Sequence, residues 1–265
     1  MIPIVAGGAP GHFRLSLTKD LCVGRIGDLF MFGGVGLASA LAAVEAATGR
    51  TTIWAAAQYL SYARPGSVLD LHVTVPVTGK YNSQARVITR LGDQEIITVN
   101  AALGSRPDSP AAQWSVMPDV PPPADCPEML LRWARDPDDL NSLFERRVAH
   151  GSFGNDRGTA GPSPDGIGQL WVRHRDPGVP IDRQLLAVMA DFLPSGVGNA
   201  LGANAGGNSL DNTIRFVRIV PTDWVLADIR IHATFDGFAH GRLHLFAQDG
   251  TLMATASQSL IVRMH

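Results

Sequence analysis

The chain has 265 residues, of which 17% are charged and 45% hydrophobic, and its formal net charge at pH 7 is -2. This length and composition suit one large domain or two smaller ones with an ample core. The slightly acidic balance argues against a nucleic-acid-binding protein, which needs a strongly basic surface.

Cysteine usage and the N-terminus predict a cytoplasmic protein. Cys22 and Cys126 are far apart and form no Cys-x-x-Cys pair, so we expect neither a disulfide framework nor a zinc site. Residues 1–10 lack a positive segment ahead of an apolar run, which indicates a loose tail and no signal peptide. Residues 29–47 are the most apolar stretch, but they contain several glycines and Glu45, so they are a poor candidate for a membrane-spanning helix. No membrane partner is expected.

A buried helix is predicted over residues 35–48, because this stretch is apolar on every helical face. Gly33 and Gly34 precede it, and Gly49 follows it as a C-terminal cap.

Antiparallel strands follow the helix. Residues 51–62 form one predicted strand, and residues 68–105 form a meander in which apolar and polar residues alternate. Pro76 indicates an edge or a bulge. One buried helix followed by a sheet that wraps around it is the arrangement called a hotdog fold.

The second half of the chain repeats this plan. Pro65 corresponds to Pro221 and Gly92 to Gly250, at offsets of 156 and 158 residues by their positions in the sequence. The second helix is expected over residues 183–200, interrupted by Pro194. The sequence therefore predicts an α+β double hotdog made of two tandem repeats, each with an antiparallel sheet around a central buried helix.

A proline-rich connector separates the halves, since residues 105–125 carry six prolines that do not suit central strands or helix interiors. A short helix is predicted over residues 127–143 and strands over 144–150 and 169–175. The expected division is an N-terminal hotdog at 1–106, the connector with its helix at 107–139, and a C-terminal hotdog at 140–265.

Common catalytic motifs are missing from the sequence: there is no Gly-x-Ser-x-Gly elbow, dinucleotide fingerprint, phosphate loop or His-x-x-x-His pair. No metal and no cofactor is therefore predicted. Gln258 is an exception among the apolar residues, because its phase in the last strand points its amide toward the core. A structural hydrogen bond would explain it equally well. Asp211 at a strand start is most simply a turn residue, and His232 shares a strand face with Thr234.

Ordered segments along the chain resemble the acyl-CoA thioesterase II family, in which two hotdogs are fused. The matching segments are FGG at 32–34, ARPG at 63–66, NSQAR at 82–86, SLDNTIRFVR at 209–218, DWVL at 223–226, QDGTLMA at 248–254 and Gln258. The resemblance covers about residues 27–263 and leaves the connector unmatched.

The resemblance implies an acyl-CoA thioesterase of lipid metabolism that holds a water between an aspartate, a hydroxyl and a glutamine. By position these are Asp211, either His232 or Thr234, and Gln258. A thioester needs no covalent nucleophile, because its thiol leaving group has a pKa of about 8.5. The backbone N–H groups of Gly33, Gly34 and Val35 would donate hydrogen bonds to the carbonyl oxygen of the thioester.

Two departures from the family pattern leave an alternative open. Val217 stands where a histidine is usual, and Arg215 stands where a bulky apolar residue is usual. A non-catalytic protein that binds acyl-CoA or another hydrophobic ligand is the alternative function. A double-hotdog enoyl-CoA hydratase is disfavoured, because its Asp-x-x-x-x-His signature is missing. The expected partner is the acyl-CoA substrate, and we expect a homo-oligomer, a dimer of double hotdogs.

Overall fold

The computed structural model describes residues 2–131, 136–156 and 160–265. In the first half its strands and helices are β1 (Ile4–Ala6), β2 (His12–Ser16), η1 (Lys19–Leu21), β3 (Cys22–Arg25), β4 (Asp28–Met31), α1 (Gly33–Thr48), β5 (Thr52–Tyr59), β6 (Val68–Thr78), β7 (Asn82–Leu91) and β8 (Gln94–Gly104).

Short 3-10 turns introduce the second half: η2 (Pro123–Asp125), η3 (Leu140–Leu143) and η4 (Gly154–Asp156). The remaining elements are β9 (Phe144–His150), β10 (Ile167–His174), α2 (Arg183–Ala190), η5 (Leu193–Ser195), α3 (Gly196–Leu201), β11 (Ala205–Ser209), β12 (Asp211–Phe216), β13 (Val225–Phe235), β14 (Phe238–Ala247) and β15 (Leu252–Met264).

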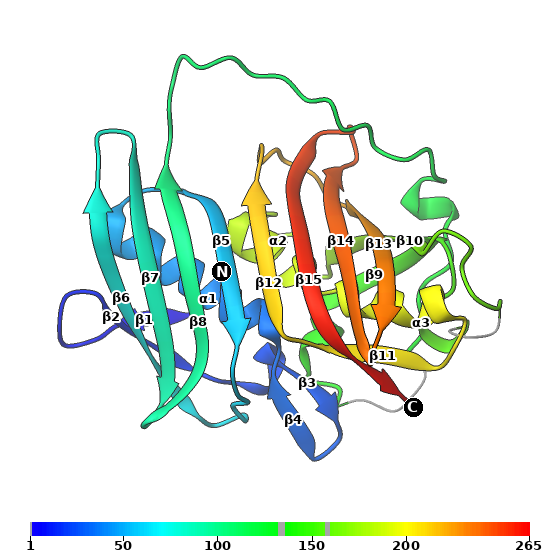
Figure 1. Ribbon diagram of the computed structural model, residues 1–265, viewed down its shortest axis with the longest axis horizontal. Coiled ribbons are helices and arrows are strands. Elements are labelled where there is room, and N and C mark those ends of the chain that lie inside the picture. The colour runs from blue at the N-terminus through cyan, green and yellow to red at the C-terminus, as the bar shows by residue number, and fades with distance from the viewer. Residues whose placement is uncertain (1, 132–135, 157–159) are drawn as a thin grey trace.

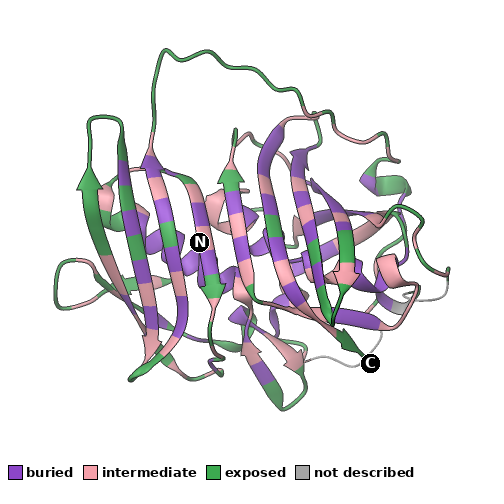
Figure 2. Cartoon of the chain, viewed as in Figure 1, coloured by how far each residue is buried: buried purple, intermediate pink, exposed green. Residues whose placement is uncertain are grey.

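The two halves share one antiparallel sheet, in the order β1-β2-β6-β7-β8-β5-β12-β15-β14-β13-β10-β9, with β11 added to β15. The halves meet where β5 pairs with β12, a pair that we call the seam (Figure 1). The helices lie behind the sheet, and buried and exposed residues alternate along its strands (Figure 2). The predicted double hotdog is confirmed.

The predicted central helix is also confirmed, since α1 is buried from Gly34 to Val44. It packs against α2 at close range, because Gly34 has no side chain. A Cβ on Gly34 would lie 2.8 Å from the backbone oxygen of Val188. Two helices approach this closely only where a residue lacks a Cβ. One hydrophobic core therefore runs through both halves.

The two hairpins that repeat along the chain can be aligned on a shared irregularity. Each has a register shift near its turn, between Thr89 and Arg90 in β7 and between Leu245 and Phe246 in β14. Aligned on these bulges, the pair Ala85–Ala101 corresponds to the pair Gly241–Gln258. The inward position that holds Gln258 in one half therefore holds Ala101 in the other.

The structure corrects the predicted helix over residues 127–143. In its described part, residues 127–129 run extended along β9: Val148 N–H donates to Pro127 O, and Met129 N–H donates to Arg146 O. The open edge of β9 needs backbone partners, and this segment supplies them. Only η3 is helical there, and residues 132–135 lie outside the described residues.

One smaller expectation changes, and two others hold. The N-terminal segment is not a loose tail, because β1 pairs with β2, and β2 pairs with β6. The second helix is broken into α2, η5 and α3, as Pro194 predicts. Pro76 lies within a register shift between β6 and β7, so the predicted bulge is confirmed.

Candidate active site

A buried carboxylate lies where α2 ends, close to the seam. Asp191 caps the C-terminus of α2 and is only 4% exposed. Its Oδ2 accepts a hydrogen bond from Gly34 N–H at 2.8 Å. Its Oδ1 accepts one from Ser209 Oγ at 2.9 Å and one from Gln258 Nε2 at 2.7 Å. Elements from both halves, α1, β11 and β15, therefore fix this carboxylate from three sides.

The environment of Asp191 suits a general base. Burial raises the pKa of its carboxyl to about 6, although the hydrogen bonds from Gln258, Ser209 and Gly34 act to lower it. The group is therefore mostly ionised at neutral pH and still basic enough to accept a proton. Oδ2 receives only one of the three hydrogen bonds, so it retains a lone pair for a water molecule.

Buried polar atoms near this carboxylate have no hydrogen-bond partner among the described residues. They are Gln258 Oε1, the Tyr59 hydroxyl and both side-chain polar atoms of Asn212. Continuing the β12–β15 register by one residue places Asn212 opposite Gln258, on the inner face of the sheet. Folded proteins satisfy nearly all buried polar groups, so such a cluster indicates a place for polar ligand atoms.

The start of α1 offers one backbone donor. Val35 and Gly36 N–H groups both donate to Phe32 O, and Gly34 N–H donates to Asp191. Three residues are predicted to donate backbone hydrogen bonds to the carbonyl oxygen. Among the described residues, only the N–H of Gly33 has no acceptor already. Gly33 also lines the cleft described next. The N–H groups of Gly34 and Val35 already have acceptors, which leaves Gly33 as the free backbone donor of the three in the described part of the chain.

A cleft of about 450 Å³ opens onto these groups between the β3–β4 hairpin, the end of α2 and β11. Gly33, Tyr59, Asp191 and Ser209 form its polar part. Its apolar wall includes Phe30, Met31, Phe32, Ile96, Met129 and Phe192, and its basic residues are Arg25, Arg146 and Arg263. A long apolar chain and a phosphorylated group could thus occupy one continuous cleft.

The Asp211 side chain bonds backbone at the start of its strand. Its Oδ1 accepts a hydrogen bond from Ser259 N–H at 2.6 Å, so it caps backbone at the start of β12. The side chain of Gln258 points inward, and Gln258 bonds Asp191 instead. The structure does not bring the side chains of Asp211 and Gln258 together, because successive side chains of a strand point to opposite faces and Asn212 holds the inward position.

The predicted hydroxyl also changes. His232 is largely exposed near the end of β13, and the partial desolvation of its ring and the charges of Arg242 and Arg230 lower its pKa. Thr234 lies beyond a register shift in β13. Among the described residues, neither side chain has a hydrogen bond to Asp191 or Gln258. Ser209 occupies that place, at the end of β11.

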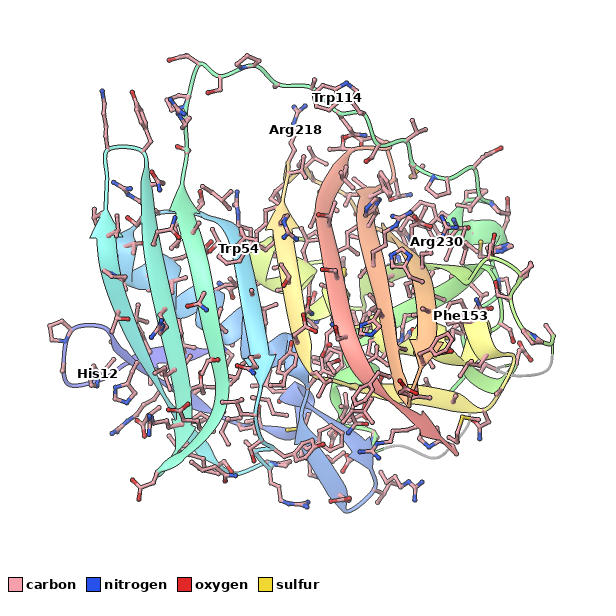
Figure 3. All side chains as sticks on the ribbon, viewed as in Figure 1. His12, Trp54, Trp114, Phe153, Arg218 and Arg230 are labelled. Carbon is pink, nitrogen blue, oxygen red and sulfur yellow. The ribbon has the colours of Figure 1, made fainter. Side chains whose placement is uncertain are left out.

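The two departures from the family pattern lie outside the cleft. Arg215 is exposed and pairs across the seam with Trp54, and Figure 3 labels Trp54 on β5. Val217 is 53% exposed. Neither residue lines the cleft, so neither alters its shape directly.

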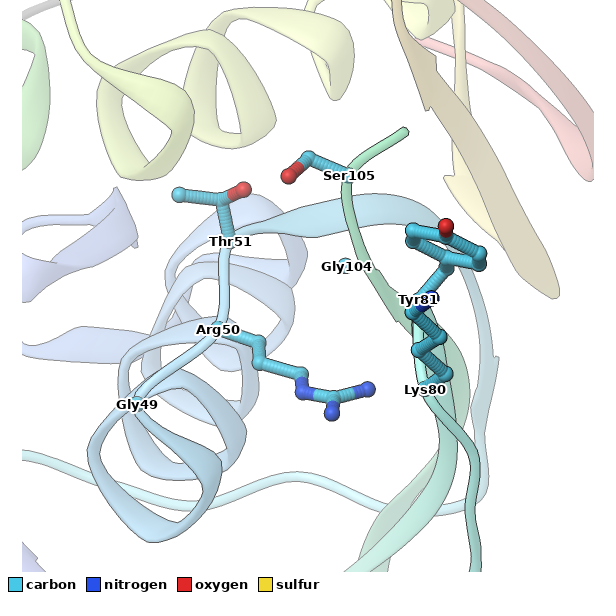
Figure 4. Close-up of a pocket in the computed structure, with 7 residues that line it drawn as sticks. All are labelled: Gly49, Arg50, Thr51, Lys80, Tyr81, Gly104 and Ser105. Atoms are coloured by element: carbon cyan, nitrogen blue, oxygen red, sulfur yellow. The ribbon is translucent and has the colours of Figure 1, made fainter. Parts of the chain in front are cut away.

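A second hollow of about 300 Å³ lies at the opposite end of α1 (Figure 4). It is lined by Gly49, Arg50, Thr51, Lys80, Tyr81, Gly104 and Ser105. Arg50 Nη2 donates to Gly79 O there. The described lining of this hollow has no carboxylate and no histidine, whereas the cleft holds the buried Asp191 carboxylate, so the cleft is the better candidate active site.

The described part of the chain holds neither a metal-binding cluster nor a membrane-spanning helix. No group of three or more His, Cys, Asp or Glu residues there could hold a metal ion. No helix in the same residues is long and apolar enough to cross a membrane.

Comparisons with known proteins give a consistent picture. Residues 119–262 match the family model of the acyl-CoA thioesterase C-terminal domain. A provisionally named thioesterase from Novosphingobium aromaticivorans is 34% identical, with a TM-score of 0.87 over 98% of each chain. An acyl-CoA thioesterase II from Mycobacterium marinum is 22% identical, with a TM-score of 0.76 over 100% of this chain and 97% of that one.

A hot dog fold protein from Alicyclobacillus acidocaldarius is 21% identical, with a TM-score of 0.83 over 99% of this chain and 96% of that one. The likenesses to the proteins from M. marinum and A. acidocaldarius concern the fold. No curated protein matches this sequence significantly.

Proposed function

We propose that this chain, which belongs to the family of the acyl-CoA thioesterase C-terminal domain and is a thioester hydrolase, cleaves a fatty or related acyl-CoA. The attacking water is activated by Asp191. The observation that carries this proposal is the buried Asp191 carboxylate held by Gln258, Ser209 and Gly34 beside the cleft.

The arrangement supports direct attack by water. Asp191 would take a proton from the water as its oxygen attacks the thioester carbonyl carbon. Gln258 Nε2 and Ser209 Oγ hold the carboxylate, and the unpartnered Gln258 Oε1 can accept a hydrogen bond from the second O–H of the water. The tetrahedral intermediate then expels the thiolate of CoA, which recovers the proton from Asp191. Gly33 N–H would stabilise the negative carbonyl oxygen meanwhile.

The cleft supports an amphiphilic substrate. Its aromatic and aliphatic wall suits an acyl chain, whereas Arg25 and Arg263 are exposed and suit the phosphates of CoA. The test is a hydrolysis screen over acyl-CoA chain lengths, with released thiol as the readout. Hydrolysis that depends on Asp191 supports the proposal. Tight acyl-CoA binding without hydrolysis would support the non-catalytic alternative instead.

The cellular setting and assembly remain proposals. Both cysteines are buried and free, and burial raises the pKa of Cys22 to about 12, which suits a cytoplasmic protein with unreactive thiols. We also propose a role in lipid metabolism. The domain boundaries are proposed after residues 106 and 139, and the assembly is proposed to be a dimer of double hotdogs. Light scattering of the purified chain tests the dimer.

The rate should depend on pH through Asp191. The base must be ionised to accept a proton, and burial raises its pKa to about 6. We therefore expect kcat/KM to be constant above about pH 7 and to fall as the pH drops through 6, approaching tenfold per unit below that. The measurement is a pH profile with a saturated acyl-CoA. A rate that stays constant down to pH 4.5 would exclude Asp191 as the base.

Replacing Gln258 should change both rate and pH profile. Gln258→Ala removes a hydrogen bond that lowers the pKa of Asp191, so the acid limb should move to higher pH. Turnover should also fall by about 10-fold or more, because the carboxylate loses one of its positioning groups. Gln58→Ala, on the exposed face of β5, is the matched control. A lower melting temperature with unchanged turnover would mean that Gln258 is only structural.

A further inference from the structure

Tyr59 is the one unpartnered group of the buried polar cluster that also reaches the cleft. Its hydroxyl oxygen is buried and makes no hydrogen bond of good geometry among the described residues, although the Asn212 side chain lies near enough to interact weakly with it. Tyr59 is one of the residues that line the cleft. Asn212 and Gln258 carry unpartnered atoms too, but neither lines the cleft. A ligand in the cleft can therefore approach Tyr59 directly.

The Tyr59 ring lies against the start of α1. A Cβ built on Gly33 would be 3.0 Å from Tyr59 Cζ and 2.7 Å from Asp191 Oδ2. Tyr59 and Asp191 therefore converge on Gly33, whose N–H has no acceptor in the described structure. A thioester attacked by a water on Asp191 must place its carbonyl group in this small space.

The Tyr59 hydroxyl keeps its proton at any working pH. Burial and the negative charge of Asp191 raise its pKa well above the usual range, although Asn212 acts in the opposite direction. A neutral phenol is a hydrogen-bond donor. Its strongest partner is an oxygen that becomes negative during the reaction, because hydrogen bonds to charged acceptors are roughly twice as strong as neutral ones.

We propose that the Tyr59 hydroxyl donates a hydrogen bond to the thioester carbonyl oxygen as it becomes negative, beside the N–H of Gly33. Tyr59 is thus a catalytic residue of the reaction, and this inference rests on the proposed function. Two donors from opposite sides, one from β5 and one from α1, complete the oxyanion site. Neither donor must reorganise during the reaction, which is the condition for effective stabilisation.

Tyr59→Phe tests this assignment, because it removes only the hydroxyl oxygen. We expect kcat to fall by about 100-fold with KM little changed, since loss of one oxyanion donor costs that much in other enzymes. The melting temperature should stay constant or rise, because an unpartnered buried hydroxyl does not stabilise the fold. Tyr81→Phe, the same change outside the cleft, is the control. Parental kcat in a folded Tyr59→Phe variant overturns the proposal.

Binding measurements separate this inference from the proposed function. A ketone analogue of acyl-CoA keeps the carbonyl oxygen, and a thioether analogue lacks it. If Tyr59 donates to that oxygen, Tyr59→Phe should weaken ketone binding by about 10-fold and leave thioether binding unchanged. Equal effects on both analogues would reject the Tyr59 assignment while hydrolysis by the parent still supports the function. A parent chain that binds neither analogue and hydrolyses nothing would reject both.

Discussion

Asp191→Asn should lower kcat by about 10² to 10⁴, because an amide cannot accept the proton that the attacking water releases. The substitution is nearly isosteric. The side-chain oxygen can still accept the hydrogen bonds from Ser209 and Gln258, and only the one from Gly34 N–H is lost. Released thiol from a saturating acyl-CoA measures the effect.

The stability of this variant should stay close to that of the parent at pH 7.5. The pKa of Asp191 is about 6 in the folded chain, above its value in an unfolded one, so its contribution to stability is complete below about pH 4 and is lost as the pH rises through 6. Asparagine avoids that loss of about 3 kcal/mol, which offsets the missing hydrogen bond. Thermal melting monitored by circular dichroism checks this.

Asp211→Asn is the matched control for Asp191→Asn. Asp211 bonds only the backbone N–H of Ser259 among the described residues, and an asparagine oxygen can accept the same bond. Turnover should therefore remain within about threefold of the parent. Loss of activity in Asp211→Asn together with parental activity in Asp191→Asn would reverse the assignment made from the structure.

Gly33→Ala should lower turnover by about 100-fold and should also lower the melting temperature, because overpacking typically costs about 1–3 kcal/mol. The added Cβ would lie 2.7 Å from Asp191 Oδ2 and 3.0 Å from the Tyr59 ring, in the space that the reacting carbonyl must enter. Gly33 has helical backbone, so alanine introduces no strain of its own. Steady-state kinetics and thermal melting of the same preparation measure the two effects. An unchanged kcat would place the reacting carbonyl elsewhere.

Gly34→Ala tests the close packing of α1 against α2 at the next position. Its Cβ would meet the Val188 backbone at 2.8 Å, so α1 and α2 must move apart. Overpacking of this kind typically costs about 1–3 kcal/mol, and the melting temperature should fall. Turnover should fall as well, because the same Cβ would lie 3.0 Å from Asp191 Cβ and Gly34 N–H helps to hold that carboxylate. Gly8→Ala, where a Cβ meets nothing within 4 Å, is the control.

The fold could be predicted because its signals are local and repeated. The all-apolar stretch at residues 35–48 fixes a helix buried on all sides, and alternation fixes the strands from Val68 to Gly104. The internal repeat then predicts the same helix and strands in the second half. The segment at 127–129 escaped prediction, because its extended form depends on the edge of β9, which lies in a later part of the chain.

The candidate site could be predicted only in part. Gln258 was identified because a polar residue stands in phase with apolar ones on a single strand. Asp191 was missed, although an acidic residue between Ala190 and Phe192 in an apolar stretch is a signal of its own. Its partners Gly34, Ser209 and Gln258 are 157, 18 and 67 residues away. Three such separate contacts appear only once the chain is folded.

The two aligned hairpins carry different residues at the same inward position, so the two halves of the chain are not chemically equivalent. An assembly of identical single hotdogs must carry each side chain at every symmetry-related position. Fusion removes that constraint, because each half mutates independently. Here the inward position of β15 carries Gln258, whereas its counterpart on β8 carries Ala101, whose side chain offers no hydrogen bond. Ala101 therefore contributes only to packing, and the inward amide of this position is present in the C-terminal half alone.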